Sequence, residues 1–343
     1  MPSVDGRGWG VLSGVARDGT PAVDVHALVK TYGDVRAVRG IDLQVEPGEI
    51  FGFLGPNGAG KSTTIKILCT LVEATSGSAR VAGFDVARQR DEVRRAIGLV
   101  FQEPTLDAYL TAEQNLRFHG ELYGVERSSA ASRREQVLSM VGLWDRRADR
   151  VQNFSGGMRR RLEIARGLLH SPQVLFLDEP TIGLDPQTRA SIWDYLGSLH
   201  ERERITVFVT THYMEEAENC DRIAIMNEGQ LVALDTPAAL KAAVGQDRVA
   251  ITTDDDAAAL EALTRLGLEP AMREGALTFS VAEGAAYVPR LFAQLTVPIR
   301  SVTVTRPSLD DVFLAYTGST IRDAEKAQGM GALWALAARR GGR

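Results

Sequence analysis

Hydrophobic and polar positions alternate near the start of the chain. Residues 23–27 and 41–45 place an apolar side chain at every second position, which is typical of strands with one buried face. Residues 49–54 are largely apolar and run into a glycine-rich turn, after which residues 62–71 have the pattern of a buried helix. The sequence therefore predicts two half-buried strands followed by a strand–turn–helix unit.

Short apolar strands and helices alternate further along the chain. Residues 174–177 and 206–209 are predicted strands, and residues 187–200 form a predicted helix between them. Residues 111–150 are rich in Glu, Arg, Ala and Leu and are predicted to be mainly helical. Because strands that alternate with helices are joined by parallel crossovers, the predicted fold class is α/β.

The pattern changes near residues 244–247, where the short strands and helices of a small α+β domain begin. We expect a flexible N-terminal tail at residues 1–22 and a main domain at residues 23–244. The α+β domain is expected at residues 245–318, and a C-terminal tail rich in Ala, Gly and Arg at residues 319–343.

The composition limits the possible partners. The 343 residues carry a formal net charge of -5, whereas a nucleic-acid-binding protein usually has a basic excess, so we expect no nucleic-acid partner. Cys69 and Cys220 lie far apart in apolar or helical surroundings, which favours free buried thiols over a disulfide or a metal site. No stretch approaches the roughly 20 apolar residues that span a bilayer, so we expect any membrane role to come through a partner.

A phosphate-binding loop follows the strand at residues 49–54. Its nine residues are Gly55, Pro56, Asn57, Gly58, Ala59, Gly60, Lys61, Ser62 and Thr63. They fit the pattern G-x-x-x-x-G-K-[ST], in which glycines let backbone N–H groups approach phosphate oxygens and the next helix points its positive end at them. We expect Lys61 to bind the β- and γ-phosphates of a nucleotide and the Ser62 hydroxyl to ligate Mg²⁺.

Two acidic residues end the apolar strand at residues 174–177. Strands of a parallel sheet deliver ligands at their C-terminal ends, so Asp178 is placed for the Mg²⁺ shell. Glu179 is placed to polarise the attacking water as a general base. Alone, such a pair is more often a solvated strand end, but with the phosphate loop it completes a Mg²⁺–ATP site.

A third motif lies just before a helix predicted at residues 159–169. It reads Asn153-Phe154-Ser155-Gly156-Gly157-Met158 and resembles the signature motif of ABC ATPases, usually written L-S-G-G-Q. In that family the signature of one subunit covers the γ-phosphate bound by another. The resemblance therefore implies that Ser155, Gly156 and Gly157 bind ATP across a head-to-tail dimer. Phe154 keeps an apolar anchor, whereas Met158 replaces a glutamine and is given no ligand role.

Four further positions match the family in its usual order. The resemblance implies that Tyr32 stacks on adenine and that Gln102 senses Mg²⁺ and the attacking water. It also places Asp185 at the dimer interface and gives His212 a contact with the γ-phosphate. The matching motifs extend over about residues 23–240.

Four stretches are similar to ATPases of daunorubicin-resistance-type exporters: residues 154–165, 179–186, 211–217 and 306–314. The resemblance implies a P-loop NTPase core with an antiparallel β subdomain and a helical subdomain. It implies an ATPase that uses ATP and Mg²⁺ to energise export of a drug, antibiotic or lipid-like substrate through a separate membrane permease. Such a subunit, expected to form a homodimer, would be cytoplasmic and lie on the cytoplasmic face of the cell membrane.

Two other classes of ABC protein share these motifs. The main alternative is a non-transport ABC ATPase acting on the ribosome or DNA. Translation-type members usually carry two ATPase cores in one chain, and DNA-repair members insert coiled coils or zinc modules. This chain has one core and only a short, cysteine-free segment between Gln102 and Ser155. A non-hydrolysing subunit is the second alternative, and the presence of Lys61, Glu179 and His212 argues against it.

Three charged runs are interpreted as structural. Arg159–Arg161 is interpreted as the solvated start of a helix. Asp254–Asp256 is interpreted as a loop that caps the helix beginning near Ala257, and Asp310-Asp311 as an N-terminal cap of the last helix.

Overall fold

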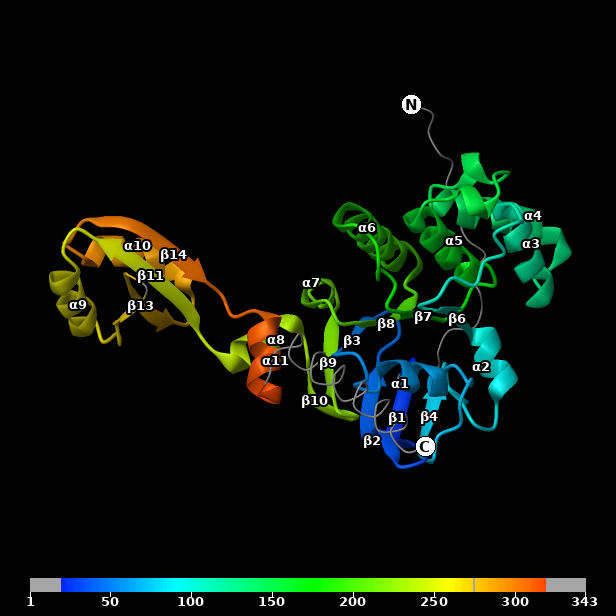
Figure 1. Ribbon diagram of the computed structural model, residues 1–343, viewed down its shortest axis with the longest axis horizontal. Helices are drawn as coiled ribbons and strands as arrows, with labels where there is room; N and C mark the ends of the chain where they lie inside the picture. Colours follow the sequence, from blue (N-terminus) through cyan, green and yellow to red (C-terminus); the bar gives the residue numbers. More distant parts are fainter. Residues whose placement is uncertain (1–19, 274, 319–343) are drawn as a thin grey trace, which may run out of the picture. The chain divides into compact units, whose positions relative to one another are not determined.

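The computed structural model describes residues 20–273 and 275–318, coloured along the chain in Figure 1. Their contacts divide the chain into two compact units between Leu231 and Val232. The predicted tail at residues 319–343, and all but the last three residues of the tail at 1–22, lie outside the described residues. Within the described part of the chain, no helix combines the length and hydropathy needed to span a membrane.

A six-stranded sheet has the strand order β10-β9-β3-β8-β7-β6, and five of its strands, β9 to β6, lie wholly in the first unit. The strands are β3 (Ile50–Leu54), β6 (Ile97–Val100), β7 (Val174–Asp178), β8 (Thr206–Thr211), β9 (Arg222–Asn227) and β10 (Gln230–Asp235). From β9 to β6, each neighbouring pair is parallel. This arrangement confirms the predicted α/β fold class.

The central strands of this sheet are buried along their whole length. Every residue of β3, β7 and β8 is buried, as expected for parallel strands that are covered on both faces. The rings of Phe51 and Phe176 each lie 5.3 Å, centroid to centroid, from the ring of Phe208. This aromatic packing joins the three strands and fixes the position of the polar residues at their C-terminal ends.

A second, four-stranded antiparallel sheet has the order β2-β1-β4-β5. Its strands are β1 (Val23–Tyr32), β2 (Val35–Val45), β4 (Ser76–Val81) and β5 (Phe84–Asp85). Helix α1 (Lys61–Leu68) packs against β2 and β4 of this sheet and against β7 of the parallel sheet. The helix that begins at the phosphate loop is therefore held between two sheets.

The remaining helices of the first unit are α2 (Arg90–Ala96), α3 (Ala112–Leu122), α4 (Arg127–Met140), α5 (Gly156–Leu168), α6 (Pro186–Glu203) and α7 (Met214–Ala217). Helices α3, α4 and α5 pack on one another and form the helical group visible in Figure 1. Two short 3₁₀ helices, at Trp144–Arg146 and Val151–Asn153, lead into α5.

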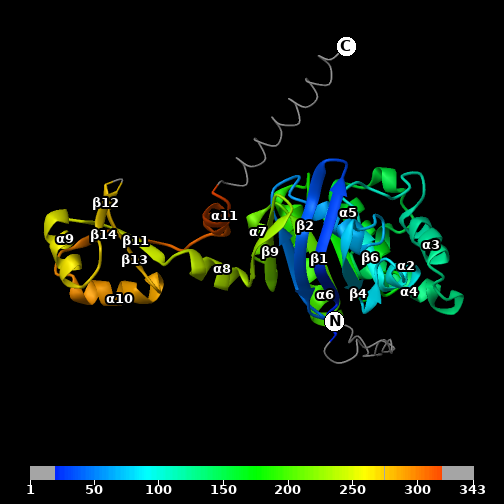
Figure 2. The same cartoon turned by 90° about the horizontal axis from the view of Figure 1, so that it is seen from below.

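The second unit contains a four-stranded antiparallel sheet with the order β12-β13-β11-β14. Its elements are α8 (Pro237–Val244), β11 (Asp247–Thr253), α9 (Asp256–Arg265), β12 (Ala271–Arg273), β13 (Ala276–Val281), α10 (Gly284–Gln294), β14 (Ile299–Thr305) and α11 (Leu309–Thr317). Helices α9 and α10 pack on this sheet (Figure 2), which confirms the predicted α+β fold of this part.

Two details of the second unit bear on the expected domain boundary and on the expected helix caps. Helix α8 packs against α11, so the contacts place α8 in this unit, whereas the sequence pattern placed residues up to 244 in the main domain. Asp255 caps α9 by accepting a hydrogen bond from the N–H of Ala258. The cap of α11 is Ser308, with Asp311 completing a capping box, so the acidic pair lies just inside the helix and does not form its cap.

Candidate functional site

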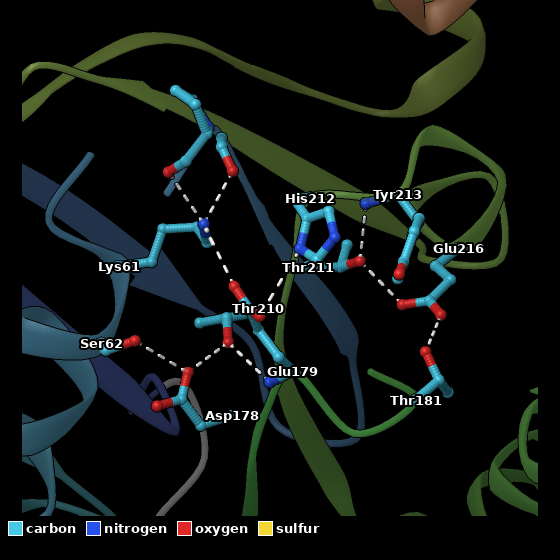
Figure 3. Close-up of polar contacts among 12 residues, drawn as sticks. Lys61, Ser62, Asp178, Glu179, Thr181, Thr210, Thr211, His212, Tyr213 and Glu216 are labelled. Carbon is cyan, nitrogen blue, oxygen red and sulfur yellow. Dashed lines mark hydrogen bonds and ion pairs between the residues drawn. The ribbon is translucent and has the colours of Figure 1, made fainter. Parts of the chain in front are cut away.

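Three neighbouring parallel strands end in polar residues at the same edge of the sheet. Strand β3 leads into the phosphate loop, β7 into the acidic pair and β8 into Thr211 and His212. The order β3-β8-β7 places the three ends side by side, at the edge where α/β sheets carry their ligands. Figure 3 shows how Lys61, Asp178, Glu179 and His212 converge there.

The phosphate loop requires glycine at the position before α1. Gly60 has a φ of 108° and is the N-cap of α1, without a side chain to cap it. A Cβ atom at this position would lie 2.4 Å from the carbonyl oxygen of Ala37. The first N–H groups of α1 are therefore left to other partners, and the backbone has the form needed to accept an anion.

Lys61 is 4% exposed although it carries a charge. Its Nζ donates hydrogen bonds to the carbonyl oxygens of Gly55, at 2.7 Å, and Pro56, at 3.0 Å. The same atom lies 3.5 Å from Oε1 of Glu179. The ammonium group is thus directed into the loop and toward the acid at the end of the neighbouring strand.

Glu179 is buried and has an unusual backbone conformation. Its φ is 47°, a left-handed value that a residue with a side chain seldom adopts. Oε2 of Glu179 lies 3.5 Å from Nδ1 of His212. Burial raises the pKa of the Glu179 carboxyl, but the nearby His212 imidazole and the charge of Lys61 outweigh it and hold that pKa below its usual value. Glu179 is therefore ionised at neutral pH and can accept a proton.

Asp178 lies within a group of hydroxyl oxygens. Its Oδ1 accepts hydrogen bonds from the hydroxyls of Ser62, at 3.1 Å, and Thr210, at 2.6 Å. Mg²⁺ prefers oxygen ligands and is usually bound by one or two carboxylates together with phosphate oxygens and water. The donor set of Ser62 and Asp178 fits that preference. The described residues hold no group of three or more His, Cys, Asp and Glu side chains arranged to bind a metal on their own.

The predicted signature residues lie at the start of α5. Ser155 is the N-cap, and its hydroxyl accepts a hydrogen bond from the N–H of Met158 at 3.2 Å. Ser155 and Gly156 are exposed, whereas Gly157 is buried, and a Cβ atom there would lie 2.4 Å from Cγ2 of Thr188.

The other predicted site residues occupy exposed positions. Tyr32 ends β1 and is 46% exposed, with Nζ of Lys30 4.8 Å from the centroid of its ring. Gln102 lies in an exposed loop after β6. Asp185 caps α6 by accepting a hydrogen bond from the N–H of Thr188 at 2.9 Å, and its hydrogen bonds with Thr188 hold the pKa of its carboxyl below the usual value.

Arg160 corrects the interpretation of Arg159–Arg161 as a solvated run, because it is only 7% exposed. Its guanidinium donates to the carbonyl oxygens of Phe101, Asp178 and Pro180. It also donates to Oε2 of Glu163 at 3.0 Å. The opposite charges three residues apart on one predicted helix face were the available signal for this pair.

Glu216 is a second buried residue at this site that sequence reasoning missed. It is 1% exposed and accepts hydrogen bonds from the hydroxyls of Thr181 and Thr211. Thr211 Oγ1 in turn accepts from the N–H of Tyr213 at 2.9 Å. Glu216 therefore ties the segment after Glu179 to the loop that carries His212, as Figure 3 shows.

Comparison with known families and relatives agrees with this geometry. The family described as ABC transporter matches residues 38–182, and the family described as ATP-binding protein DrrA1-3-like, C-terminal domain, matches residues 236–317. The linearmycin resistance ATP-binding protein LnrL of Bacillus subtilis is 39% identical over 86% of this chain and 98% of its own length. The daunorubicin/doxorubicin resistance ATP-binding protein DrrA of Streptomyces peucetius is also 39% identical, over 89% of this chain and 94% of its own length.

Solved structures show the same fold. The cbiO1 protein of Clostridium perfringens, described as part of the ABC transporter complex cbiONQ, superposes with a TM-score of 0.60 and 28% identity, over 64% of this chain and 90% of that chain. The ATP-binding cassette MJ0796, solved as a dimer in a post-hydrolysis state bound to ADP and Pi, gives a TM-score of 0.57 and 30% identity. That match covers 62% of this chain and 98% of the cassette.

Proposed function

This chain belongs to the ABC transporter family as an ATP-hydrolysing subunit that energises export, and from that premise we propose which of its residues bind ATP, hold the metal ion and hydrolyse the nucleotide. The observation that carries the proposal is that Lys61, Asp178, Glu179 and His212 converge at one edge of the sheet. This edge lies next to the phosphate loop, in which a Cβ atom at Gly60 would clash with the backbone of Ala37. Within one chain, this edge has a cation for phosphate, oxygen ligands for a metal ion and an ionised acid.

ATP binding is assigned to the phosphate loop, Gly55–Thr63. Backbone N–H groups and Lys61 bind the phosphates, and the free N-terminus of α1 adds its dipole. Tyr32, which is exposed at the end of β1, is proposed to stack on the adenine ring. Gln102 and Asp185 are proposed to act from the loop after β6 and from the dimer interface, respectively.

Ser62 and Asp178 are proposed to hold Mg²⁺, with Gln102 reaching it when the site closes. When bound, Mg²⁺ neutralises charge on the phosphates and orients them for in-line attack. The chain supports this geometry through Oδ1 of Asp178, which is fixed by two hydroxyl donors.

Glu179 is proposed to act as the general base for hydrolysis. Its lowered pKa keeps the carboxylate ionised, so that it can accept a proton from the attacking water. Nδ1 of His212, 3.5 Å from Oε2, keeps the acid oriented and is proposed to contact the γ-phosphate. A positioned base of this kind contributes about 10²–10⁴-fold to the rate.

The working unit is proposed to be a head-to-tail homodimer. Ser155 and Gly156 are exposed at the start of α5. They would complete the ATP site of a second copy, with Gly157 keeping the helix start close to α6. The dimeric state of the cassette MJ0796 supports this arrangement.

The chain is proposed to act with a separate permease at the cytoplasmic face of the cell membrane. Relatives are described as resistance proteins for linearmycin and for daunorubicin/doxorubicin, and as Nod factor export ATP-binding protein I. These names support a drug, antibiotic or lipid-like substrate. The second unit, matched by a C-terminal family at residues 236–317, is proposed to stabilise the dimer or regulate it.

The dimer is tested with Glu179→Gln, which keeps the binding loop but removes the base. Size-exclusion chromatography with light scattering should show a monomer without nucleotide and a dimer with Mg²⁺ and ATP. The matched control adds Lys61→Ala to Glu179→Gln and should stay monomeric. A Glu179→Gln chain that binds ATP but never dimerises would contradict the homodimer, and one that hydrolyses ATP at the native rate would contradict the role of Glu179.

Export is tested in a host strain that lacks the gene for this chain. Loss of the gene should raise sensitivity to one or more amphipathic antibiotics, and the native gene should restore resistance. Glu179→Gln should fail to restore it although the protein is present at normal levels. Full resistance with Glu179→Gln would show that export does not depend on this ATPase.

A further inference from the structure

Strand β8 ends in two buried threonines that bond to different partners. Thr210 and Thr211 are both 0% exposed. The hydroxyl of Thr210 donates to Oδ1 of Asp178 at 2.6 Å and accepts from the N–H of Glu179 at 3.0 Å. Figure 3 shows this hydroxyl between the side chain of one acid and the backbone of the next.

We propose that Thr210 is a positioning residue that holds the metal-binding acid, Asp178, and the general base, Glu179, in fixed positions relative to each other. The proposal rests on the function assigned above. A hydroxyl has one hydrogen, so the donation to Asp178 leaves its lone pairs for the N–H of Glu179. One atom of β8 thus bonds to both the Asp178 carboxylate and the backbone of Glu179, and it shares the orientation of that carboxylate with the hydroxyl of Ser62.

The backbone of Glu179 needs this support. Its φ of 47° is costly for a residue with a side chain and persists only where neighbours hold it. The N–H of Glu179 bonds to the hydroxyl of Thr210 and also approaches its carbonyl oxygen at 3.2 Å. The Glu179 side chain lies 3.5 Å from both Nζ of Lys61 and Nδ1 of His212, so these backbone contacts hold the residue that carries it.

The hydroxyl also affects how well Asp178 can hold Mg²⁺. This ion requires nearly ideal octahedral geometry, so a carboxylate that rotates freely is a poorer ligand than a fixed one. Groups that orient metal ligands typically contribute 10–100-fold to metal affinity or activity. Loss of the Thr210 hydroxyl should therefore weaken the metal site and slow hydrolysis, while the phosphate loop remains intact.

A strand at this position does not itself require threonine. Valine has nearly the same shape, is also favoured in strands and carries a methyl group in place of the hydroxyl. Thr206 at the other end of β8 offers a matched control. It is 3% exposed, and its hydroxyl also accepts from a backbone N–H, that of Gly48, at 2.9 Å.

The test compares Thr210→Val and Thr210→Ser with Thr206→Val in the full chain. ATP hydrolysis is measured over a range of Mg²⁺ concentrations, and binding of Mn²⁺ with ATP is measured by electron paramagnetic resonance in the Glu179→Gln background. Thr210→Val should lower kcat and metal affinity by about 10-fold or more, with little change in ATP affinity measured without metal. Thr210→Ser should remain close to the native protein, and Thr206→Val should lose stability without either functional change.

If Thr210→Val does not fold, Thr210→Ala and Thr210→Ser provide the same comparison, since they also differ by one hydroxyl. Native metal affinity and kcat in the variant without the hydroxyl would overturn the proposal. Equal losses in Thr206→Val would also overturn it, because the effect would then be one of stability. If Lys61→Ala and Glu179→Gln also left hydrolysis unchanged, the proposed function itself would be wrong, which separates the two failures.

Discussion

Helices α1 and α5 both begin at a site proposed to bind phosphate, but their first residues differ. Helix α1 begins after Gly60, which has no side chain and a left-handed backbone. Helix α5 begins after Ser155, whose hydroxyl already caps the helix. The start of α1 is surrounded by buried polar residues of its own chain, whereas Ser155 and Gly156 are exposed.

This difference supports the proposal that each ATP site is shared between two chains. Lys61 is held by two carbonyl oxygens and lies beside Glu179, so the proposed catalytic residues are already in contact within one chain. The start of α5 is exposed at Ser155 and Gly156, as expected for a segment that is proposed to complete the site of a second copy. We call the start of α1, with Lys61, Asp178 and Glu179, the first region, and the start of α5, with Ser155 and Gly156, the second region. Variants in the first region should therefore affect ATP binding and hydrolysis, and variants in the second region should affect dimer assembly.

Lys61→Ala is expected to have the largest effect on the first region. It removes the charge that stabilises the phosphates, so hydrolysis should fall by at least about 10²–10³-fold. Isothermal titration with ATP and a steady-state assay would measure the loss. Lys66→Ala, on the same helix at an exposed position, is the control and should behave like the native chain. If Lys61→Ala hydrolysed ATP at the native rate, the proposed role of the first region in hydrolysis would be wrong.

Ser155→Arg is expected to break only the second region. The position is exposed, so the variant should fold and bind ATP as a monomer, but a large cation at the interface should prevent closure. Hydrolysis should then be lost because the site of the other copy is not completed. The expected measurement is normal ATP binding together with no ATP-dependent dimer in light scattering.

A mixing experiment makes the comparison sharper. In a head-to-tail dimer of Lys61→Ala with Ser155→Arg, one site contains both defects and the other contains none. Two inactive chains should therefore recover part of the hydrolysis when they are mixed. No recovery, with mixed dimers present, would contradict a site shared between the two regions of different chains.

Arg160 and Glu163 connect the two regions within one chain. Arg160 lies near the start of α5 and bonds to carbonyl oxygens on both sides of Glu179, those of Asp178 and Pro180. Glu163→Gln would leave the buried guanidinium with less compensation and should lower the free energy of unfolding by about 3 kcal/mol. Urea denaturation would measure this, and Arg160→Met combined with Glu163→Gln should cost less than the sum of the single changes.

An exposed pair with the same spacing serves as the control for this prediction. Arg146 and Asp149 form an ion pair three residues apart, with side chains 51% and 40% exposed. Asp149→Asn should cost no more than about 1 kcal/mol. Similar costs for Glu163→Gln and Asp149→Asn would show that the buried pair does not join the two regions.

The sequence predicted those parts of the fold in which the local pattern decides the structure. Strands β3, β7 and β8 each contain a short run of mainly apolar residues, and each was predicted within one or two residues of its observed bounds. Strand β4 was missed, because it begins Ser76-Gly77-Ser78 and has only two buried residues. It is a strand because it pairs with β1, from Val23 opposite Val81 onward, which a local pattern cannot show.

The residues of the candidate site also fall into two groups, those that a local pattern predicts and those that only the fold brings together. Lys61, Glu179 and Ser155 lie in short motifs, so neighbouring residues were enough to predict a role for each of them. The residues that hold the motifs together were not predicted, because their partners are distant in sequence. The N–H of Thr105 donates to Glu163 across 58 positions, and the Thr210 hydroxyl reaches Asp178 across 32. A buried polar residue must find a partner, but its identity depends on the fold.

The smallest expected effect concerns acid stability in the helical group that carries α5. The ring of Tyr123 lies 4.4 Å, centroid to centroid, from the rings of both His119 and His170. Burial lowers the pKa of both histidines, and the charge of Arg166 helps to bring that of His119 to about 3. In the unfolded chain the histidine pKa is about 6.5, so the unfolded state binds more protons as the pH falls.

The sign of the pH effect follows from these pKa values. The contribution of neutral His119 is fully present above about pH 6.5 and is lost as the pH falls toward about 3. His119→Phe cannot be protonated, so its urea midpoint should fall less between pH 7 and pH 5 than that of the native chain. Phe118→Leu, at an exposed position on α3, is the control and should retain the native slope. If His119→Phe also kept the native slope, His119 would be charged in the folded protein, and α5 would then be packed against a charged group rather than a neutral ring.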